Sequence, residues 1–400
     1  MKIDGRQIAL TGGTPMFDRP RPTGQIHTPD VDAFMTRFDR ILEGRRYSNG
    51  GPFQEELEGR LADWHRVDHV VAFGNACFAL IALMRHLARP DAGHVLLPSF
   101  SYRGLPHFVQ WAGKTPRFCD VDERTHGLTA ATASDLAVGG EVAAILSVNN
   151  VNGPSDLAGL DRLAQDLGVP LIHDSVYAIA AEWNEAPFGR HGAAEVFSLH
   201  ATKLVNGFEG GYITTNDPAL AESMRNIRNF GYDTASPHIL HLGMNGKLNE
   251  LHAAMALTSL DEIDLALAHN REIIAAYRAV VGDDAGVRIV QPEPGMVSND
   301  EMVLLEVDDG HELGRDGFLL ALQAEGAHAR PYFDPPLHRS KNCPPAAAGA
   351  ELPVSDRLAT RFAQLPTGAF VNRADATAIA HLIVELDRRA GEAARAVPAE

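Results

Sequence analysis

A single lysine, Lys203, lies among Ser, His, Thr and Gly between two apolar stretches, in residues 197–217, FSLHATKLVNGFEGGYITTND. A glycine-bearing turn follows it, and then a run with the composition of a β-strand. A lysine that is held out of water can become a neutral amine and form a Schiff base with an aldehyde. A lysine in a solvated polar loop does neither, and the segment alone leaves both interpretations open.

An aspartate, Asp174, ends the apolar run VPLIHD. A carboxylate at the end of a buried strand is costly unless a cation pairs with it, and the protonated nitrogen of an aromatic cofactor ring would be such a cation. A turn or helix N-cap aspartate has the same local pattern. Both interpretations of Asp174 therefore remain open at this point.

Two further segments could contact an anionic, aromatic ligand. In FGNACFAL, residues 73–80, a strand turns into a helix at Ala76–Cys77, and the unpaired N–H groups at a helix start can bind an anion. In PSFSYRG, Tyr102 follows a strand and could stack on a ring. A helix start without a ligand and an aromatic residue at the rim of the core are the simpler alternatives.

Strands and helices that could position these residues alternate between residues 53 and 260. The strands are nearly continuous apolar runs, which predict a mostly parallel α/β sheet covered by helices on both faces. In such sheets ligands bind at the carboxyl ends of the strands. Gly74, Ser99–Tyr102, Asn149–Gly153 and Asp174 all fall at such ends.

We expect three parts in the chain: an irregular, Gly- and Pro-rich N-terminal arm over residues 1–30, a large domain over 31–255, and a smaller C-terminal α+β domain over 256–400. In the small domain, strands are predicted at 302–307 and 327–333 on either side of a helix, and residues 340–352 read as a loop.

Composition limits the function classes. The 400 residues carry a formal charge of −17, which argues against a nucleic-acid partner. No run of eighteen apolar residues or signal-peptide pattern is present, so we expect no membrane partner and a cytoplasmic location. The three cysteines are far apart, and His65 and His69 have no third ligand nearby; we predict neither a disulfide framework nor a metal site.

These residues together carry a resemblance to a known family. Residues 197–217 resemble the cofactor-lysine segment of the DegT/DnrJ/StrS family of sugar aminotransferases, which depend on pyridoxal 5′-phosphate (PLP) and have the aspartate aminotransferase fold type I. The family pattern is Ser-Phe-His-x-x-Lys, then Glu-Gly-Gly and Thr-Asn-Asp. The resemblance covers most of the chain, including VLLPSFSYRGLPHFVQWAGKTPRFCDVDERTHGL, HLGMNGKLNELHAAMAL and RPYFDPPLH.

The resemblance implies a role for each matching residue. Lys203 would form the Schiff base and act as the acid–base group, and Asp174 would bond the pyridinium nitrogen. The remaining cofactor contacts would be Ser198, Ala76 and Cys77 at the phosphate, Tyr102 and Tyr177 at the ring, and Asn245 at the phosphate of the neighbouring subunit. The resemblance thus implies a homodimer with active sites at the interface. Substrate contacts are expected from Arg228, Arg330 and His338, with Arg45 and Arg46 as further candidates for a diphosphate.

Several positions depart from the family pattern. Cys77 replaces a hydroxyl donor, Tyr177 stands where the family has His or Gln, and Lys247 stands where it often has Arg. Asn149–Asn150 also replace the usual pair after the buried strand. Related deoxygenating enzymes carry a histidine in place of the lysine, so the retained Lys203 favours transamination.

The expected activity is transfer of an amino group from an amino acid, with L-glutamate as the expected donor, to a ketone on a nucleotide-linked sugar, by ping-pong kinetics, in natural-product or polysaccharide biosynthesis. One alternative is a transaminase for a keto-cyclitol. An alternative of another class is a non-catalytic PLP-binding homologue, which the intact Lys203, Asp174 and Ser198 disfavour. A dinucleotide-binding protein would need G-x-G-x-x-G after a strand, and FGNACF lacks it.

Overall fold

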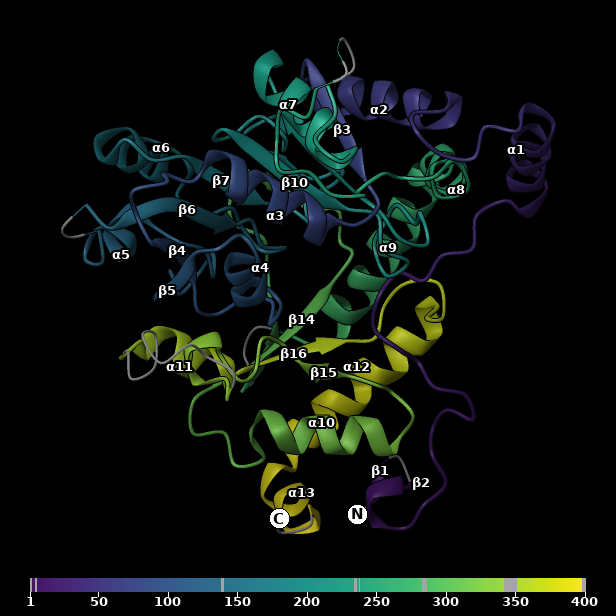
Figure 1. The fold of residues 1–400 in the computed structure, drawn as a ribbon. Helices are drawn as coiled ribbons and strands as arrows, with labels where there is room; N and C mark the ends of the chain where they lie inside the picture. The colour runs from purple at the N-terminus through teal and green to yellow at the C-terminus, as the bar shows by residue number, and fades with distance from the viewer. Residues whose placement is uncertain are drawn as a thin grey trace.

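A seven-stranded sheet forms the centre of the large domain in the computed structural model, with the order β3-β11-β10-β7-β6-β4-β5 (Figure 1). Every neighbouring pair is parallel except the two pairs that involve β11. The strands are β3 (His69–Phe73), β4 (His94–Pro98), β5 (Thr115–Cys119), β6 (Val142–Val148), β7 (Leu171–Asp174), β10 (Ala194–Ser198) and β11 (Gly211–Thr215). The structure describes residues 2–3, 6–137, 140–233, 236, 238–282, 286–341 and 351–397.

Helices cover both faces of this sheet, which confirms the predicted α/β class. The core on one face is built with α3 (Ala76–Leu87), α4 (Leu105–Trp111) and α7 (Pro218–Arg228). The core on the other face is built with α2 (Pro52–His65), α5 (Ala130–Ser134), α6 (Leu157–Leu167) and α8 (Glu250–Asp261). All seven residues of β6 are buried, because helices lie over both of its faces.

The small domain is built on a four-stranded antiparallel sheet with the order β12-β14-β16-β15. Its strands are β12 (Val287–Ile289), β14 (Val303–Val307), β15 (Arg330–Pro331) and β16 (Phe362–Leu365). The core of this domain uses α9 (Ile263–Val280), α10 (Gly314–Ala324), α12 (Arg373–Arg388) and α13 (Ala390–Ala396). The strand predicted at 302–307 is present, whereas the one predicted at 327–333 is reduced to two residues.

The predicted domain boundary at residues 255 and 256 falls inside α8. That helix packs against α2 and against α1 (Val31–Gly44) of the large domain, whereas α9 packs along α12 of the small domain. We therefore propose that the large domain passes into the small one near Glu262, between these two helices.

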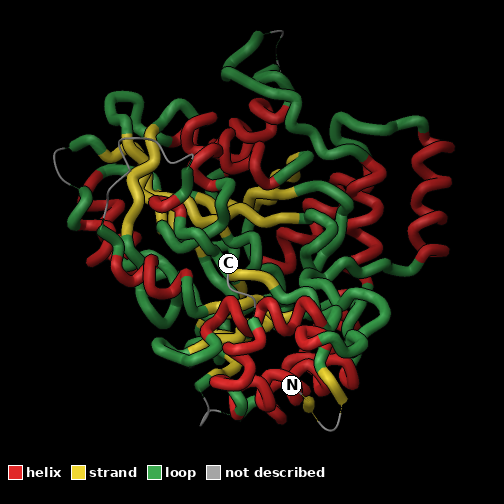
Figure 2. Tube along the Cα trace, turned by 90° about the horizontal axis from the view of Figure 1, so that it is seen from below, coloured by secondary structure: helices red, strands yellow, loops and turns green. Residues whose placement is uncertain are grey.

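The N-terminal arm lies along the small domain. Its elements are β1 (Lys2–Ile3), β2 (Arg6–Gln7) and the 3-10 helix η1 (Ala9–Thr11), which packs on α10. The backbone N–H of Phe17 donates to the carbonyl of Glu325, and Arg21 forms an ion pair with Asp375 at 2.8 Å. In the view from below, helices of the small domain lie beside the N-terminus (Figure 2).

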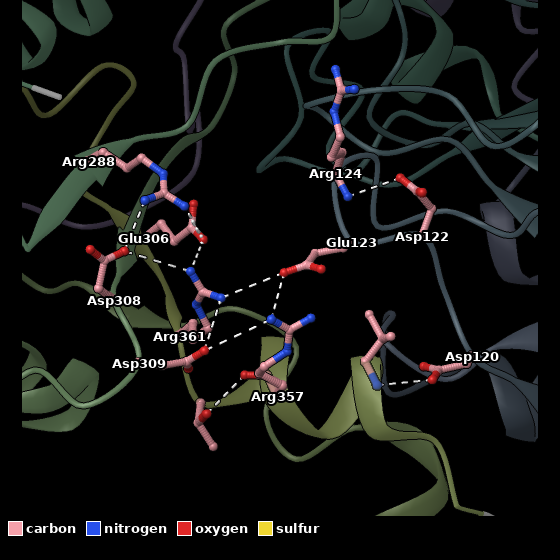
Figure 3. Close-up of polar contacts among 12 residues, drawn as sticks. Asp120, Asp122, Glu123, Arg124, Arg288, Glu306, Asp308, Asp309, Arg357 and Arg361 are labelled. Carbon is pink, nitrogen blue, oxygen red and sulfur yellow. Dashed lines mark hydrogen bonds and ion pairs between the residues drawn. The ribbon is translucent and has the colours of Figure 1, made fainter.

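Charged residues that follow β5 in the sequence join the two domains (Figure 3). Glu123 forms ion pairs with Arg357 of α11 (Pro353–Ala359) at 2.7 Å and with Arg361 at 3.8 Å. Within the small domain, Arg361 also pairs with Glu306 of β14 at 2.5 Å. Asp120 accepts hydrogen bonds from the first N–H groups of α11, at 3.0 and 2.8 Å. A carboxylate at the end of a large-domain strand therefore caps a small-domain helix.

The remaining elements are short. A three-stranded sheet is formed by β8 (Glu182–Trp183), β9 (Ala186–Pro187) and β13 (Met296–Val297), and η2 (Leu337–Arg339) follows β15. Among the described residues, none of the helices is both long and apolar enough to span a membrane, and no cluster of metal-ligating side chains is found. Most of the loop predicted at 340–352, including Cys343, lies outside the described residues.

Candidate active site

The carboxyl ends of β7 and β10 bring two of the predicted residues to one edge of the sheet. Asp174 is the last residue of β7 and pairs in register with Val196 of β10, which ends two residues later at Ser198. Ser198 pairs in turn with Gly211 at the start of β11. A Cβ on Gly211 would lie 2.5 Å from the backbone nitrogen of Ala76, so glycine there lets the start of α3 approach the same edge.

Lys203 lies in the connection between β10 and β11, and 9% of its surface is exposed. Its ε-amino nitrogen is 3.3 Å from the centre of the Tyr177 ring. Burial lowers the pKa of Lys203, while the carboxylates of Glu301 and Asp174 oppose that shift. The result is an amine that loses its proton more easily than a solvated lysine, which a nucleophile or base requires.

Asp174 is a buried carboxylate with 3% of its surface exposed. One of its oxygens accepts a hydrogen bond from the N–H of Val176 at 3.2 Å. Burial raises its pKa to about 6, against the smaller effects of this hydrogen bond and of Lys203. Such a carboxylate is unfavourable in the protein alone and would be stabilised by a cationic ring nitrogen.

The start of α3 is capped from within. The Asn75 side chain accepts a hydrogen bond from the N–H of Cys77 at 2.8 Å and donates one to Glu209 at 2.8 Å. Cys77 is half-buried, and burial together with the charge of Asp174 raises the pKa of its thiol to about 11. The thiol is thus neutral at ordinary pH, and it lies close enough to Asp174 for that carboxylate to raise its pKa.

Tyr102 also faces this group of residues. Its ring is 47% exposed and packs over Gly104, where a Cβ would lie 2.4 Å from the ring. Burial raises the pKa of its hydroxyl, and negative charge on an ionised Cys77 and on Asp174 adds to the shift. The structure therefore gathers most of the predicted cofactor residues at one edge of the sheet: Lys203, Asp174, Ser198, Ala76, Cys77, Tyr102 and Tyr177.

This donor set fits PLP. A buried amine of lowered pKa suits an aldehyde, and the buried carboxylate suits a protonated pyridine nitrogen. The hydroxyl of Ser198 and the start of α3 lie at the same edge and suit a phosphate.

The predicted substrate residues have different surroundings. Arg330 is exposed on β15 and donates a hydrogen bond to the side chain of Gln364 at 2.8 Å. Its positive charge acts to lower the pKa values of Lys203 and Tyr177. Arg228 instead forms an ion pair with Glu58 at 2.5 Å. Arg228 also donates to a backbone carbonyl of β3 at 2.7 Å, so its guanidinium group serves the large-domain core.

His338 is buried between the two domains. Its Nδ1 lies 2.6 Å from the hydroxyl of Ser99, and its Nε2 lies 3.2 Å from the carboxylate of Asp356. The order Ser-His-Asp is that of a hydrolase triad, but the Ser99 side chain is fully buried and offers nothing to a substrate. These contacts fasten η2 to the residue after β4 and to α11, so His338 has a structural role here and the predicted substrate contact is not supported.

Asn245 lies on an exposed segment after α7 and is bridged to Asn229. Arg45 and Arg46 are exposed at the end of α1. His65 uses both ring nitrogens in hydrogen bonds, to the carbonyl of Phe188 and the hydroxyl of Tyr212, and so serves the core.

Glu301 is a buried, charged neighbour of Lys203 that the sequence did not reveal. It lies just before β14 and is 2% exposed, and its negative charge acts to raise the pKa of Lys203. Residues 298–302 read SNDEM, which is the composition of an ordinary polar loop, so no pattern marks Glu301 as buried.

Comparison with known proteins identifies the family. Residues 30–384 match the model of the DegT/DnrJ/EryC1/StrS aminotransferase family. A dTDP-4-amino-4,6-dideoxy-D-glucose transaminase of Shigella dysenteriae is 29% identical over 320 residues, which are 80% of this chain and 86% of that protein. An L-glutamine:2-deoxy-scyllo-inosose aminotransferase of Streptomyces kanamyceticus is 26% identical over 404 residues, covering 90% and 92% of the two chains.

Solved structures agree with these matches. The crystal structure of DesI in the presence of its TDP-sugar product superposes with a TM-score of 0.89 at 35% identity, over 96% of this chain and 97% of that one. Helicobacter pylori PseC, at 21% identity and a TM-score of 0.83 over 93% and 99% of the two chains, supports the fold. The chain therefore belongs to the DegT/DnrJ/EryC1/StrS family and is a PLP-dependent aminotransferase.

Proposed function

We propose that the protein moves an amino group from an amino acid, with L-glutamate as the donor, to the ketone of a nucleotide-linked sugar, and that Lys203 is the residue that binds the cofactor. The observation that carries this proposal is the buried amine of Lys203 against Tyr177, with the Asp174 carboxylate within electrostatic reach. The likeness to DesI, whose structure contains a TDP-sugar product, supports a nucleotide-linked acceptor.

Bound PLP would supply an electron sink for the bonds at the donor's Cα. In this proposal Asp174 holds a proton on the ring nitrogen, and Ser198 with the start of α3 holds the phosphate. The ε-amino nitrogen of Lys203, once neutral, takes a proton from the donor's Cα, and the same atom returns a proton to the acceptor carbon in the second half-reaction. The guanidinium group of Arg330 binds an anionic part of a substrate.

A homodimer with shared active sites is part of the proposal. Exposed apolar side chains follow α7 on the segment that carries Asn245: Phe230 (44% exposed), Tyr232 (48%), Ile239 (68%), Leu240 (55%) and Leu242 (73%). Clustered exposed apolar residues are typical of an interface. We propose that a second copy covers them and that Asn245 reaches the cofactor phosphate of that copy. Sedimentation of the purified protein should give a dimer.

A keto-cyclitol is the second candidate acceptor, and the likeness to the scyllo-inosose aminotransferase favours it. Both acceptors use the same chemistry at Lys203 and differ in whether a diphosphate must be bound. We propose the cytoplasm as the location for either activity.

The acceptor is tested by converting the cofactor fully to its amino form with glutamate, removing the donor, and adding single ketones. A nucleotide-linked keto-sugar should restore the visible absorbance of the aldehyde form, and a free keto-cyclitol should not. Restoration by the cyclitol alone would replace the first candidate with the second. The Lys203→Ala variant is the control and should show neither half-reaction above about 10⁻² to 10⁻⁴ of the wild-type rate.

A further inference from the structure

The buried carboxyl group of Glu301 takes no part in the chemical steps of the proposed function. One of its oxygens, Oε2, is buried and has no hydrogen-bond partner among the residues that the structure describes. A buried, unpartnered carboxylate oxygen costs free energy, so its retention needs a compensating charge or ligand. The cationic group that acts on this carboxyl group is the ε-ammonium of Lys203, which lowers the pKa of Glu301 against the larger effect of burial.

The backbone around Glu301 is fastened from two sides. Asn299 accepts a hydrogen bond from the N–H of Glu301 at 3.1 Å, and its amide donates to the carbonyls of Tyr177 at 2.9 Å and Ile179 at 2.8 Å. Residue 301 is therefore tied to the segment that carries the ring under Lys203.

The N-terminal arm joins Glu301 to Thr202, the residue before Lys203. The side chain of Gln25 donates to the carbonyl of Glu301 at 2.8 Å, and the backbone N–H of Gln25 donates to the carbonyl of Thr202 at 3.0 Å. Gln25 is 3% exposed, so this bridge is itself buried. Glu301 and the residue before Lys203 are thus held by one buried residue, through its side chain and its backbone N–H.

We propose that Glu301 is a positioning residue for Lys203, and that its buried carboxylate supplies the counter-charge that keeps the ε-ammonium group in the site when no cofactor is joined to it. This inference rests on the proposed role of Lys203 as the cofactor lysine. In this role the Glu301 carboxylate raises the pH at which the amine of Lys203 becomes neutral.

The other charged and titratable groups around Lys203 do not replace Glu301. Asp174 acts on Lys203 less strongly, and Arg330 acts in the opposite direction. The face of the Tyr177 ring attracts the ammonium without adding a charge. On the carboxyl side, burial raises the pKa of Glu301, while Lys203 and the N–H of Leu204 lower it.

The test measures Lys203 directly in the cofactor-free protein. The full chain is treated with acetic anhydride across a pH series, and the rate at the Lys203 peptide is followed by mass spectrometry. Because an opposite charge at close range shifts a pKa by about 1 to 3 units, Glu301→Gln should lower the apparent pKa of Lys203 by at least about one unit. In the pH range where Glu301 is ionised and the Lys203 amine of the wild type is still largely protonated, acetylation of Lys203 in Glu301→Gln should then be up to about tenfold faster.

Asp300→Asn is the matched control, because Asp300 is the neighbouring acid and interacts with Arg278 and Arg271. That variant should leave the pH profile of Lys203 unchanged. Glu301→Asp keeps the charge one methylene further away and should give a smaller downward shift, which serves as the measurement if Glu301→Gln does not fold. If Glu301→Gln, or Glu301→Asp where the first variant does not fold, leaves the pH profile of Lys203 unchanged, the inference is overturned.

The readout also separates the two proposals. Lys203 acetylation in the cofactor-free protein does not depend on whether Lys203 binds PLP. A shifted profile combined with an active Lys203→Ala variant would therefore reject the proposed function and keep the electrostatic link between Glu301 and Lys203.

Discussion

The ε-amino nitrogen of Lys203 lies over the ring of Tyr177, 3.3 Å from its centre, and the ring follows Asp174 by three residues. The π face of an aromatic ring attracts a cation, so Tyr177 favours the protonated amine and offsets part of the cost of its burial. The contact gives the tyrosine at this position, where the family has His or Gln, a definite partner in Lys203. We expect Tyr177→Leu to lose this attraction while keeping an apolar wall beside the amine.

Asp174 should destabilise the cofactor-free protein at neutral pH. Its folded-state pKa of about 6 lies above the unfolded value of 3.8, so its contribution to stability is greatest below pH 3.8 and is lost as the pH rises through 6. We expect Asp174→Asn to raise the free energy of unfolding at pH 8 by up to about 3 kcal/mol. The same variant should bind PLP more weakly.

Urea unfolding of the cofactor-free proteins at pH 4 and pH 8 checks this expectation. The difference between wild type and Asp174→Asn should be small at pH 4 and large at pH 8. Equal differences at the two pH values would contradict the assigned pKa.

Cys77 offers a poor hydrogen-bond donor at a position proposed to face the cofactor phosphate. Cys77→Ser replaces the thiol by a hydroxyl group and should tighten PLP binding about two- to tenfold, as one added hydrogen bond allows. Fluorescence titration of the cofactor-free protein measures the dissociation constant. Cys77→Ala is the control without a donor, and a gain in affinity equal to that of serine would show that side-chain size, not hydrogen bonding, is responsible.

Arg228 and Arg330 should respond differently to truncation. Arg228→Ala leaves Glu58 as an uncompensated, largely buried carboxylate and should cost about 3 kcal/mol of stability, with KM little changed in the folded fraction. Arg330→Ala should leave the melting temperature nearly unchanged and raise the KM for one of the two substrates. Thermal melts and steady-state kinetics on both variants decide this, and the reverse pattern would exchange the two roles.

Shared active sites predict complementation between inactive subunits. Lys203→Ala lacks the acid–base group of its own site, and Asn245→Ala lacks the group proposed to serve the other subunit's site. Refolding an equal mixture should restore about a quarter of wild-type activity, because half of the dimers are mixed and each has one intact site. Activity that stays at the level of the separate variants would place Asn245 in its own subunit's site or outside any site.

The central sheet could be predicted because its strands are apolar along their whole length. Strand β6 coincides with the nearly unbroken apolar run VAAILSV at 142–148, since a strand buried on both faces needs apolar residues along its whole length. The short strands β12 and β16 were not expected, because runs of three and four residues carry too little pattern. Strand β15 depends on its pairing with β16 more than on its own sequence.

The clustering of candidate site residues could be predicted where a motif holds them close in sequence, as it does Ser198 and Lys203. It was not predictable where partners come from distant segments. Nothing in the sequence pairs Arg228 with Glu58 or His338 with Ser99, and both residues were expected at the substrate. Glu301 was missed for the same reason, since its burial results from contacts with residues far away in the chain.

The bridge made by Gln25 joins residues 276 positions apart in the sequence, Gln25 and Glu301. During synthesis the arm leaves the ribosome early, yet it has no partner for this hydrogen bond until the small domain has been made. Contacts of such long sequence separation are slow to form because the entropy of closing the loop must be overcome first. We therefore expect the surroundings of Lys203 to be completed late in folding, and a chain truncated before residue 301 to lack a finished site even if its central sheet forms.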